Sequence, residues 1–315
     1  MPAEVMIRQL EYLVALARER HFARAAAACH VSQPALSAGV RKLETELGVM
    51  IVLRGQRFAG FTAEGEHVVG WAHRILAERD ALLDDLNRMR QGLSATLRVG
   101  AIPTAVPASS LLTAPFCARN PLARVRIEVL PSREILRRLA EFDLDVGLTY
   151  IDAEALHGVR ATALYRESYL LLTPSDGELA GRACVGWAEA AATPLCMLSP
   201  VMQNRRILDG IIAAAGATLN PVVETDTVAA LYAHVATRKW SSIIAHAWLH
   251  AFGVPDGMQI IPLHPPARSP QIGLVRADRD PEPMVAGALL EAVRDVDLPT
   301  ILDALLARYV QSAQS

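Results

Sequence analysis

The sequence lacks the features that mark membrane, secreted and disulfide-stabilised proteins. No run of about eighteen or more uninterrupted apolar residues occurs, which argues against a membrane span. The first residues include acids and contain no apolar segment of the kind that a secretory signal requires. The only cysteines, Cys29, Cys117, Cys184 and Cys196, lie far apart without a C-x-x-C pair, which favours a reducing compartment over a disulfide or zinc framework. We therefore expect a cytoplasmic protein.

The sequence also lacks the short motifs of common enzyme classes. It contains no G-x-S-x-G, no phosphate-binding P-loop and no G-x-G-x-x-G, so acyl-transfer and nucleotide chemistry have no evident site. His246 and His250 are four residues apart, but the glutamate of a zinc protease motif is missing. We expect a protein that is not an enzyme and that holds neither a metal nor a cofactor.

Charge is unevenly distributed along the chain. The net charge is −2, yet residues 1–60 hold eight Lys and Arg against five acids, which leaves +3 there and −5 on the remainder. A modestly basic end on an acidic chain suits a protein that touches phosphates with one end only.

The N-terminal segment predicts three helices. Apolar residues at helical spacing indicate a first helix over 7–20, and the alanine-rich run Phe22–Cys29 indicates a second. His30-Val31 forms the turn, and Ser32 is a good N-cap for a third helix that ends at Gly48. Three helices with a tight turn are typical of a helix-turn-helix that binds DNA.

A hairpin and a long helix follow. The apolar runs Ile51–Leu53 and Phe58–Phe61 flank a tip that carries two arginines, as a DNA-binding wing does. From Thr62 to about Gln91, apolar residues follow four-three spacing for more than three heptads, which favours pairing with a partner helix. The alternative is a long helix packed only on its own domain.

From Thr96 onward, short apolar strands alternate with helices, which is the pattern of an α/β fold. The predicted helices lie near 107–119, 132–142, 204–215 and 225–238, with two more at Val285–Val293 and Ile301–Val310. The predicted strands are Leu97–Ile102, Val125–Leu130, Val146–Tyr150, Tyr169–Thr173, Leu195–Leu198, Ser242–Ala245 and Ile272–Val275.

The predicted DNA-contacting surface is the outer face at the start of the third helix, together with the wing. Gln33 can bond an adenine edge, Ser37 a base or phosphate, and Arg41 a phosphate or guanine, while the wing would reach the flanking backbone or minor groove. The alternative is an ordinary solvated helix face. The complete prediction comprises Ser32, Gln33, Pro34, Ser37, Arg41, Arg54 and Arg57.

The run from His21 to Gly65 resembles the DNA-binding segment of the LysR-type transcriptional regulators. The matching positions, in order and spacing, are Phe22, Ala25-Ala26, Ser32 to Ser37, Leu43-Glu44, Leu47-Gly48, Arg54, Thr62 and Gly65. The rest of the chain is compatible with the family. One departure is Ala38-Gly39, where the family often has a basic or amide residue, so base contacts from that position are in doubt.

The resemblance implies an architecture for the whole chain. The expected order along the chain is an all-α winged helix-turn-helix (1–62), then a long linker helix (63–92), then an α/β effector domain that resembles a periplasmic binding protein. That domain would have two subdomains joined by crossing strands, the first from 93–165 plus 268–315 and the second from 166–267. The partners implied are double-stranded promoter DNA, a small-molecule effector, a second copy in a homodimer or dimer of dimers, and RNA polymerase.

Ligands of such folds bind between subdomains, near strand ends and helix N-termini, where N–H groups favour anions. Hydroxyl and amide residues at those places suggest a small anion, above all a carboxylate, and the resemblance points towards small-acid oxidation such as formate metabolism. Plain N-capping is the alternative for each hydroxyl. The predicted effector residues are Pro103, Thr104, Ser132, Tyr150, Ser199, Met202, Gln203, Asn204 and Thr227.

A thiol switch is the rival function. Some regulators of this family respond through a cysteine pair, and Cys184 and Cys196 are twelve residues apart. Buried, inert thiols are the simpler interpretation.

Overall fold

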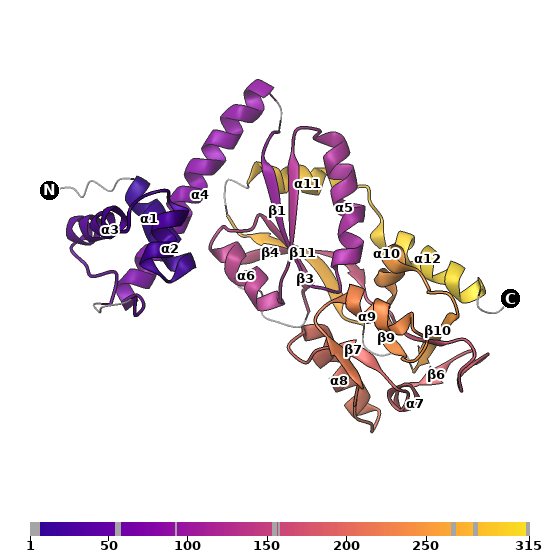
Figure 1. The fold of residues 1–315 in the computed structure, drawn as a ribbon. Helices are drawn as coiled ribbons and strands as arrows, with labels where there is room; N and C mark the ends of the chain where they lie inside the picture. The colour runs from indigo at the N-terminus through magenta and orange to yellow at the C-terminus, as the bar shows by residue number, and fades with distance from the viewer. Residues whose placement is uncertain are drawn as a thin grey trace. The chain divides into compact units, whose positions relative to one another are not determined.

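The computed structural model describes residues 7–53, 58–91, 93–152, 156, 158–265, 269–279 and 283–312. Its contacts form two compact units, Met1–Gly92 and Leu93–Ser315 (Figure 1). Across the described ranges, no helix combines the length and apolarity needed to cross a bilayer.

The first unit is built from helices α1 (Ile7–Glu19), α2 (Phe22–Ala28), α3 (Gln33–Leu47) and the long α4 (Ala63–Gln91). The predicted caps are confirmed. The Ala35 N–H donates to Ser32 Oγ at 3.3 Å, and Gly48 ends α3 with φ of 69°. The Gly65 N–H donates in the same way to Thr62 Oγ1 at 2.8 Å, which satisfies one free N–H at the start of α4.

The turn between α2 and α3 is also as predicted. His30 has φ of 54°, and the Val31 N–H donates to the Ala26 carbonyl at 3.0 Å, closing the end of α2. Ala25 and Ala26 are buried in a core shared by α1, α2 and α3, where small side chains permit close helix approach.

The base of the predicted wing is present. Val52 and Phe61 form an antiparallel bridge, and the Leu53 N–H donates to the Gly60 carbonyl at 3.0 Å. The tip with Arg54 and Arg57 lies outside the described residues.

The second unit contains two main sheets. In the first sheet the strand order is β2 (Arg124–Val129), β1 (Thr96–Ala101), β3 (Val146–Tyr150), β11 (Gln271–Ala277) and β4 (Val159–Arg166). β1, β2 and β3 are parallel, and β11 runs antiparallel to both of its neighbours. Its helices are α5 (Val106–Arg119), α6 (Ser132–Ala140) and α11 (Met284–Val293).

The second sheet has the order β6 (Val185–Gly186), β10 (Met258–His264), β5 (Tyr169–Pro174) and β9 (Ser242–Ala245). A parallel pair, β7 (Cys196–Leu198) and β8 (Val223–Thr225), adjoins it through the bridge between Leu195 and Ser241. The accompanying helices are α7 (Trp187–Ala191), α8 (Gln203–Ala214), α9 (Val228–Val235), the 3₁₀ turn η1 (His246–Trp248) and α10 (Leu249–Phe252).

The chain passes between the sheets twice, from β4 to β5 and from β10 to β11. We call the part around the first sheet the first subdomain and the part around the second sheet the second subdomain, since each has its own apolar core. Helix α12 (Leu298–Ser312) packs on both: Leu302 is buried in the first core, and Leu305 contacts the second.

All seven predicted strands are present, with ends that differ by at most two residues. β4, β6, β8 and β10 were not predicted. β10 contains Pro262, which weakens a strand pattern, and most of β4 is exposed, so it lacks the apolar signal of a buried strand. The helix predicted over 225–238 is shorter, because Thr225 pairs with Leu198 in β8.

Candidate functional site

Helix α3 presents a polar outer face. Gln33, Pro34 and Arg41 are exposed and Ser37 is half-buried, whereas Leu36 on the opposite side is fully buried. The helix axis of α3 is fixed because its inner face packs against α1 and α2. The described part of the predicted DNA surface therefore lies together on one accessible helix face, where Ser32 serves as the cap.

At the departure Ala38-Gly39, the glycine has a packing reason and the exposed Ala38 has none. A Cβ on Gly39 would lie 2.6 Å from the ring of Tyr12 in α1, closer than side-chain atoms approach. Glycine at this position allows α1 to pack against α3, and the exposed Ala38 leaves no polar group beside Ser37.

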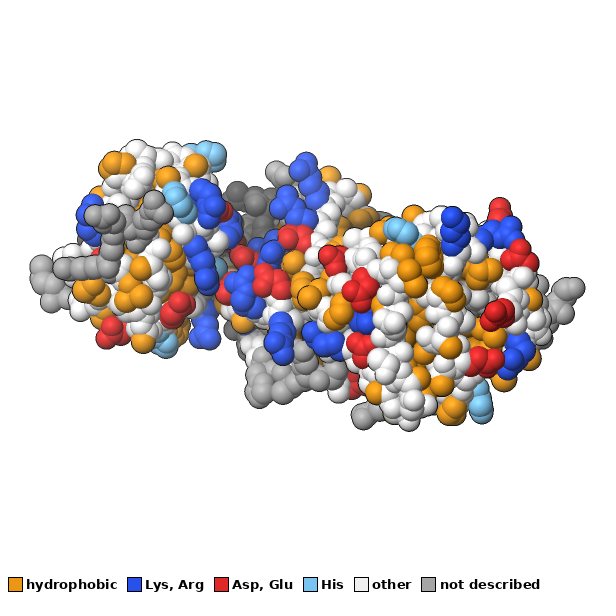
Figure 2. Space-filling model, turned by 60° about the horizontal axis from the view of Figure 1, so that its bottom comes forward, with side chains coloured by type: hydrophobic (Ala, Val, Ile, Leu, Met, Phe, Trp, Pro, Cys, Tyr) orange, Lys and Arg blue, Asp and Glu red, His pale blue; other side chains and the backbone are white. Residues whose placement is uncertain are grey.

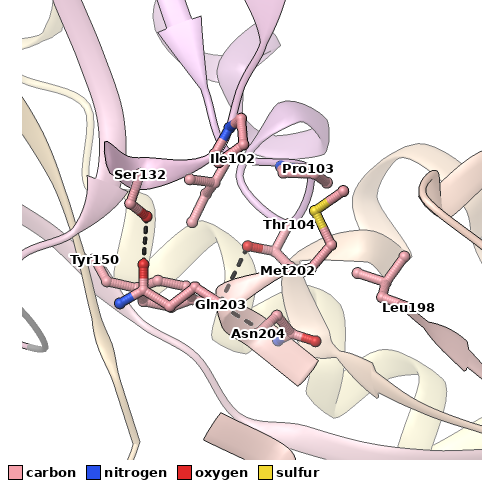
Figure 3. A pocket seen from close by; sticks show the side chains of 10 residues that line it. Ile102, Pro103, Thr104, Ser132, Tyr150, Leu198, Met202, Gln203 and Asn204 are labelled. Carbon is pink, nitrogen blue, oxygen red and sulfur yellow. Dashed lines mark hydrogen bonds between the residues drawn. The ribbon is translucent and has the colours of Figure 1, made fainter. Parts of the chain in front are cut away.

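A pocket lies between the two subdomains in the second unit (Figure 3). Its cavity is only about 10 Å³, roughly the space for one water molecule. Seven of the nine predicted effector residues line it. The lining consists of Ile102, Pro103, Thr104, Pro131, Ser132, Tyr150, Leu198, Met202, Gln203 and Asn204.

A side-chain contact closes this pocket. The Ser132 hydroxyl, at the start of α6, donates to the Gln203 amide oxygen at the start of α8 (Figure 3). The Thr149 hydroxyl donates in turn to Ser132 Oγ at 2.8 Å. Ser132 makes no capping bond, so plain N-capping does not explain it. The contact joins the first subdomain to the second.

Two helices begin at this pocket without a capping side chain. Pro131 precedes α6 and Met202 precedes α8, and neither provides a side-chain acceptor for the first-turn N–H groups. Such helix starts favour negative charge. The nearby cation Arg205 is already paired with Asp209 at 2.9 Å and Glu224 at 2.7 Å. The described residues that line the pocket include no Lys or Arg.

Two predicted effector residues lie elsewhere. The Ser199 hydroxyl donates to Asp226 at 2.5 Å, and Thr227 caps α9 by accepting from the Ala230 N–H at 3.2 Å. Neither lines the pocket. Sequence reasoning missed Ile102, Pro131 and Leu198, although each is adjacent to a predicted strand end or helix start.

A buried carboxyl group that was not predicted lies behind the pocket. Glu167, between β4 and β5, is fully buried and accepts hydrogen bonds from the hydroxyls of Tyr150 at 2.9 Å and Tyr169 at 3.0 Å. Burial raises the pKa of Glu167 from 4.5 to about 7, while the hydrogen bonds from the two tyrosines act in the opposite direction. Its only sequence signal was a single acid two residues before the apolar strand β5.

The surface of the second unit carries mixed charge. On the face shown in Figure 2, acidic and basic side chains are interspersed with apolar ones. This distribution offers no broad basic surface there for a nucleic acid.

Two family models match the sequence. The one described as bacterial regulatory helix-turn-helix protein, lysR family, matches residues 7–66, and the LysR substrate binding domain matches residues 90–297. The DNA-binding transcriptional dual regulator OxyR of Escherichia coli (strain K12) is 33% identical over 294 residues, which is 91% of this chain and 94% of that protein. A hydrogen peroxide-inducible genes activator of Dickeya chrysanthemi is 31% identical over 270 residues, 85% of this chain and 88% of that protein.

Solved structures share the fold. A full-length OxyR variant from Pseudomonas aeruginosa has a TM-score of 0.73 at 25% identity, covering 94% of this chain and 97% of that chain. Full-length CbnR in complex with its target DNA has a TM-score of 0.63 at 21% identity, covering 92% and 99%. The two sequence relatives are named as a transcriptional regulator and a genes activator, and none of the four names mentions formate.

Proposed function

This chain belongs to the LysR family of DNA-binding transcription regulators, and on that premise we propose that a small anion in the pocket between the subdomains modulates its promoter binding. The observation that carries the proposal is the meeting of two uncapped helix starts with the side chains of Thr104, Ser132 and Gln203. Backbone N–H groups and neutral donors without a cation suit a singly charged carboxylate.

The effector binds two arrangements of the subdomains with different affinities, and it thereby shifts the equilibrium between them. In the described arrangement, Ser132 and Gln203 bond to each other across the pocket. A carboxylate would replace this contact with bonds to itself. Because the cavity has room for about one water molecule, even formate or acetate requires the subdomains to separate slightly, and a larger acid requires a wider separation.

The test compares acids with their neutral amides. We expect formate, acetate or benzoate to raise the unfolding temperature of the full chain more than formamide, acetamide or benzamide. A ligand at about 100 times its Kd adds about 2.7 kcal/mol to the free energy of unfolding. Gln203→Ala should remove the shift and Ser199→Ala, outside the pocket, should retain it. Equal shifts for acid and amide, or no shift with any acid, would refute the proposal.

DNA contact is assigned to α3 and the wing. We propose that Gln33, Ser37 and Arg41 read the major groove, flanked by Ser32 and Pro34, while Arg54 and Arg57 contact the neighbouring backbone. The exposed outer face of α3 supports the first part of this assignment.

Self-association belongs to the same proposal. The C-terminal half of α4 exposes Leu82, Leu83 and Leu86, a surface that suits a second copy of the helix. We propose a homodimer, assembled into a dimer of dimers, in which paired α4 helices set the spacing of two α3 helices on one promoter. The protein would act in the cytoplasm, together with RNA polymerase.

A thiol switch is the second candidate, and the name of the Dickeya chrysanthemi relative, a hydrogen peroxide-inducible genes activator, favours it. The expectation of buried thiols is wrong for Cys117 and Cys184, which are exposed, and holds for Cys196. Of the proposed pair Cys184 and Cys196, one thiol is therefore unsuited to the switch. Cys196 is buried, and burial raises its pKa to about 11, so little reactive thiolate forms. A variant with Cys117, Cys184 and Cys196 replaced by serine should bind DNA as the parent does, before and after peroxide. Loss of a peroxide response in that variant would support the thiol switch.

A further inference from the structure

Glu167 occupies an unusual position for a carboxyl group. It lies on the first of the two chain crossings between subdomains and is fully buried. Both hydrogen bonds that it accepts in the described structure reach the same oxygen, Oε2, from Tyr150 and Tyr169. The other oxygen, Oε1, has no hydrogen-bond partner among the described residues.

A short chain of hydrogen bonds connects this carboxyl group to the pocket. The Tyr150 hydroxyl, which donates to Glu167, also lies 3.3 Å from Thr104 Oγ1 and accepts from Asn204 Nδ2 at 3.3 Å (Figure 3). Thr104 and Asn204 both line the pocket. A ligand held by either residue is therefore three hydrogen bonds from Glu167.

Within the described ranges, the groups around Glu167 supply no compensating positive charge. From β4, Tyr165 approaches with a hydroxyl that has no hydrogen-bond partner among the described residues. From η1, His246 accepts from the Ser168 N–H at 3.0 Å, and burial lowers its pKa, which keeps the ring neutral although Asp303 of α12 opposes this shift. Arg166 is exposed and donates to the Ser269 carbonyl at 2.8 Å.

A buried carboxyl without a cation favours its neutral form, and a second negative charge nearby strengthens that preference. We propose that Glu167 takes up one proton from solvent when a small anion enters the pocket, so that the affinity for the effector falls as the pH rises. This inference rests on the proposed function of the pocket. It makes Glu167 a positioning residue that acts on the ligand through Tyr150.

The pH range follows from the state of Glu167 in the empty pocket. Burial raises its pKa to about 7, so below this pH the proton is already present and affinity should be constant. Above it, binding must draw a proton from solvent, and the affinity for an anion should fall by up to about tenfold per pH unit, the limit for uptake of one whole proton. The affinity for a neutral ligand should change little.

The experiment measures binding of formate, acetate and benzoate, and of their amides, to the full chain between about pH 6 and 8.5 by calorimetry. We expect the affinity for the acids to decline above about pH 7 and that for the amides to stay level. Glu167→Gln, which removes the titrating group at equal size, should bind the acids with constant affinity. Tyr165→Phe, a neighbouring buried change, should retain the decline.

The outcomes separate the two proposals. Acid binding that does not depend on pH, or a decline that persists in Glu167→Gln, would overturn the proton coupling and leave the effector site standing. If no acid binds at any pH, both fail. Should Glu167→Gln not fold, Tyr169→Phe removes one donor to Oε2 and should start the decline at a higher pH. An unchanged starting point would overturn the coupling.

Discussion

Two glycines of α4 differ only in what surrounds them. Gly65 lies in the first turn, where a Cβ would stand 2.1 Å from the Ile51 carbonyl oxygen. That oxygen belongs to backbone at the base of the wing and cannot move aside cheaply. Gly70 is exposed within the helix and has nothing within 4 Å of a Cβ. The first glycine permits a close approach, and the second only adds chain flexibility.

Alanine should therefore have opposite effects at the two positions. Gly65→Ala should lower the free energy of unfolding by about 1–3 kcal/mol through overpacking. Gly70→Ala should raise it by up to about 1 kcal/mol, because alanine loses less chain entropy in a helix. Denaturant unfolding of both variants checks this. A loss of similar size at both positions would show that the contact with Ile51 is not the cause.

The DNA surface gives a second comparison of single residues. Gln33→Ala should relax sequence preference, at a cost of about 1–3 kcal/mol for the preferred site, because it removes a contact with a base edge. Arg54→Ala should weaken binding to all sequences alike and flatten the salt dependence. Selection from random DNA followed by titration at several salt concentrations measures both. Unchanged preference in Gln33→Ala would remove this residue from the reading surface.

Helix α4 has two halves with different environments. Its first half packs on α1, where Ala72 is fully buried, and the contact with α1 extends to Arg79, just past the middle, which pairs with Glu11. In its second half, the exposed fraction is 59% for Leu82, 52% for Leu83 and 44% for Leu86. The heptad spacing of the sequence predicted a paired helix, and the described structure supplies an internal partner for the first half only.

Charges on the exposed half should separate the proposed dimer. In the double variant Leu82→Glu and Leu86→Glu, each lost leucine removes about 1.5–3 kcal/mol of burial, so dimerisation should weaken by a factor of about 100 or more. Sedimentation of the purified chain measures the mass. Arg74→Glu, an exposed change on another side of α4, should leave the dimer intact. Dimers that persist in the double variant contradict this role of α4.

Helix caps and buried strands were predictable because their signals are local. Ser32 and Gly48 are a strong N-cap and C-cap for α3, and the short stretch Val146–Tyr150, rich in β-forming residues, favoured a buried strand. The pairing of β3 with β11 could not be predicted, because Leu148 and Leu274 lie far apart in the sequence.

The role of each hydroxyl residue near the predicted site was ambiguous for the same reason. Ser132 and Ser199 look alike, and only their distant neighbours place one in the pocket and the other against Asp226.

At the scale of the whole molecule, two carboxyl groups shift stability in opposite pH ranges. The hydrogen bond from Arg137 lowers the pKa of Glu134 to about 2, so its contribution is present above the unfolded value of 4.5 and is lost as pH falls through 2. Glu167 behaves inversely. Because burial raises its pKa to about 7, its contribution is full below 4.5 and is lost as pH rises through 7.

The Glu167 effect can be isolated by substitution. Raising the pH from 4.5 to about 8 should cost the parent chain about 3 kcal/mol through this one group, and Glu167→Gln should lack that loss. Urea unfolding of both chains at a series of pH values gives the measurement, and the difference between their free energies of unfolding is plotted against pH. A difference that does not vary with pH would mean that Glu167 stays ionised in the folded state.

The two chain crossings also fix an order of events during synthesis. β11 occupies the place between β3 and β4 in the first sheet, yet it follows the whole second subdomain in the sequence. On the ribosome, the second subdomain has all of its strands while the first sheet still lacks an inner strand. The later-made half of the effector region should therefore be the first to resist proteolysis in a nascent chain, and the earlier-made half should wait for residues 271–277 to emerge.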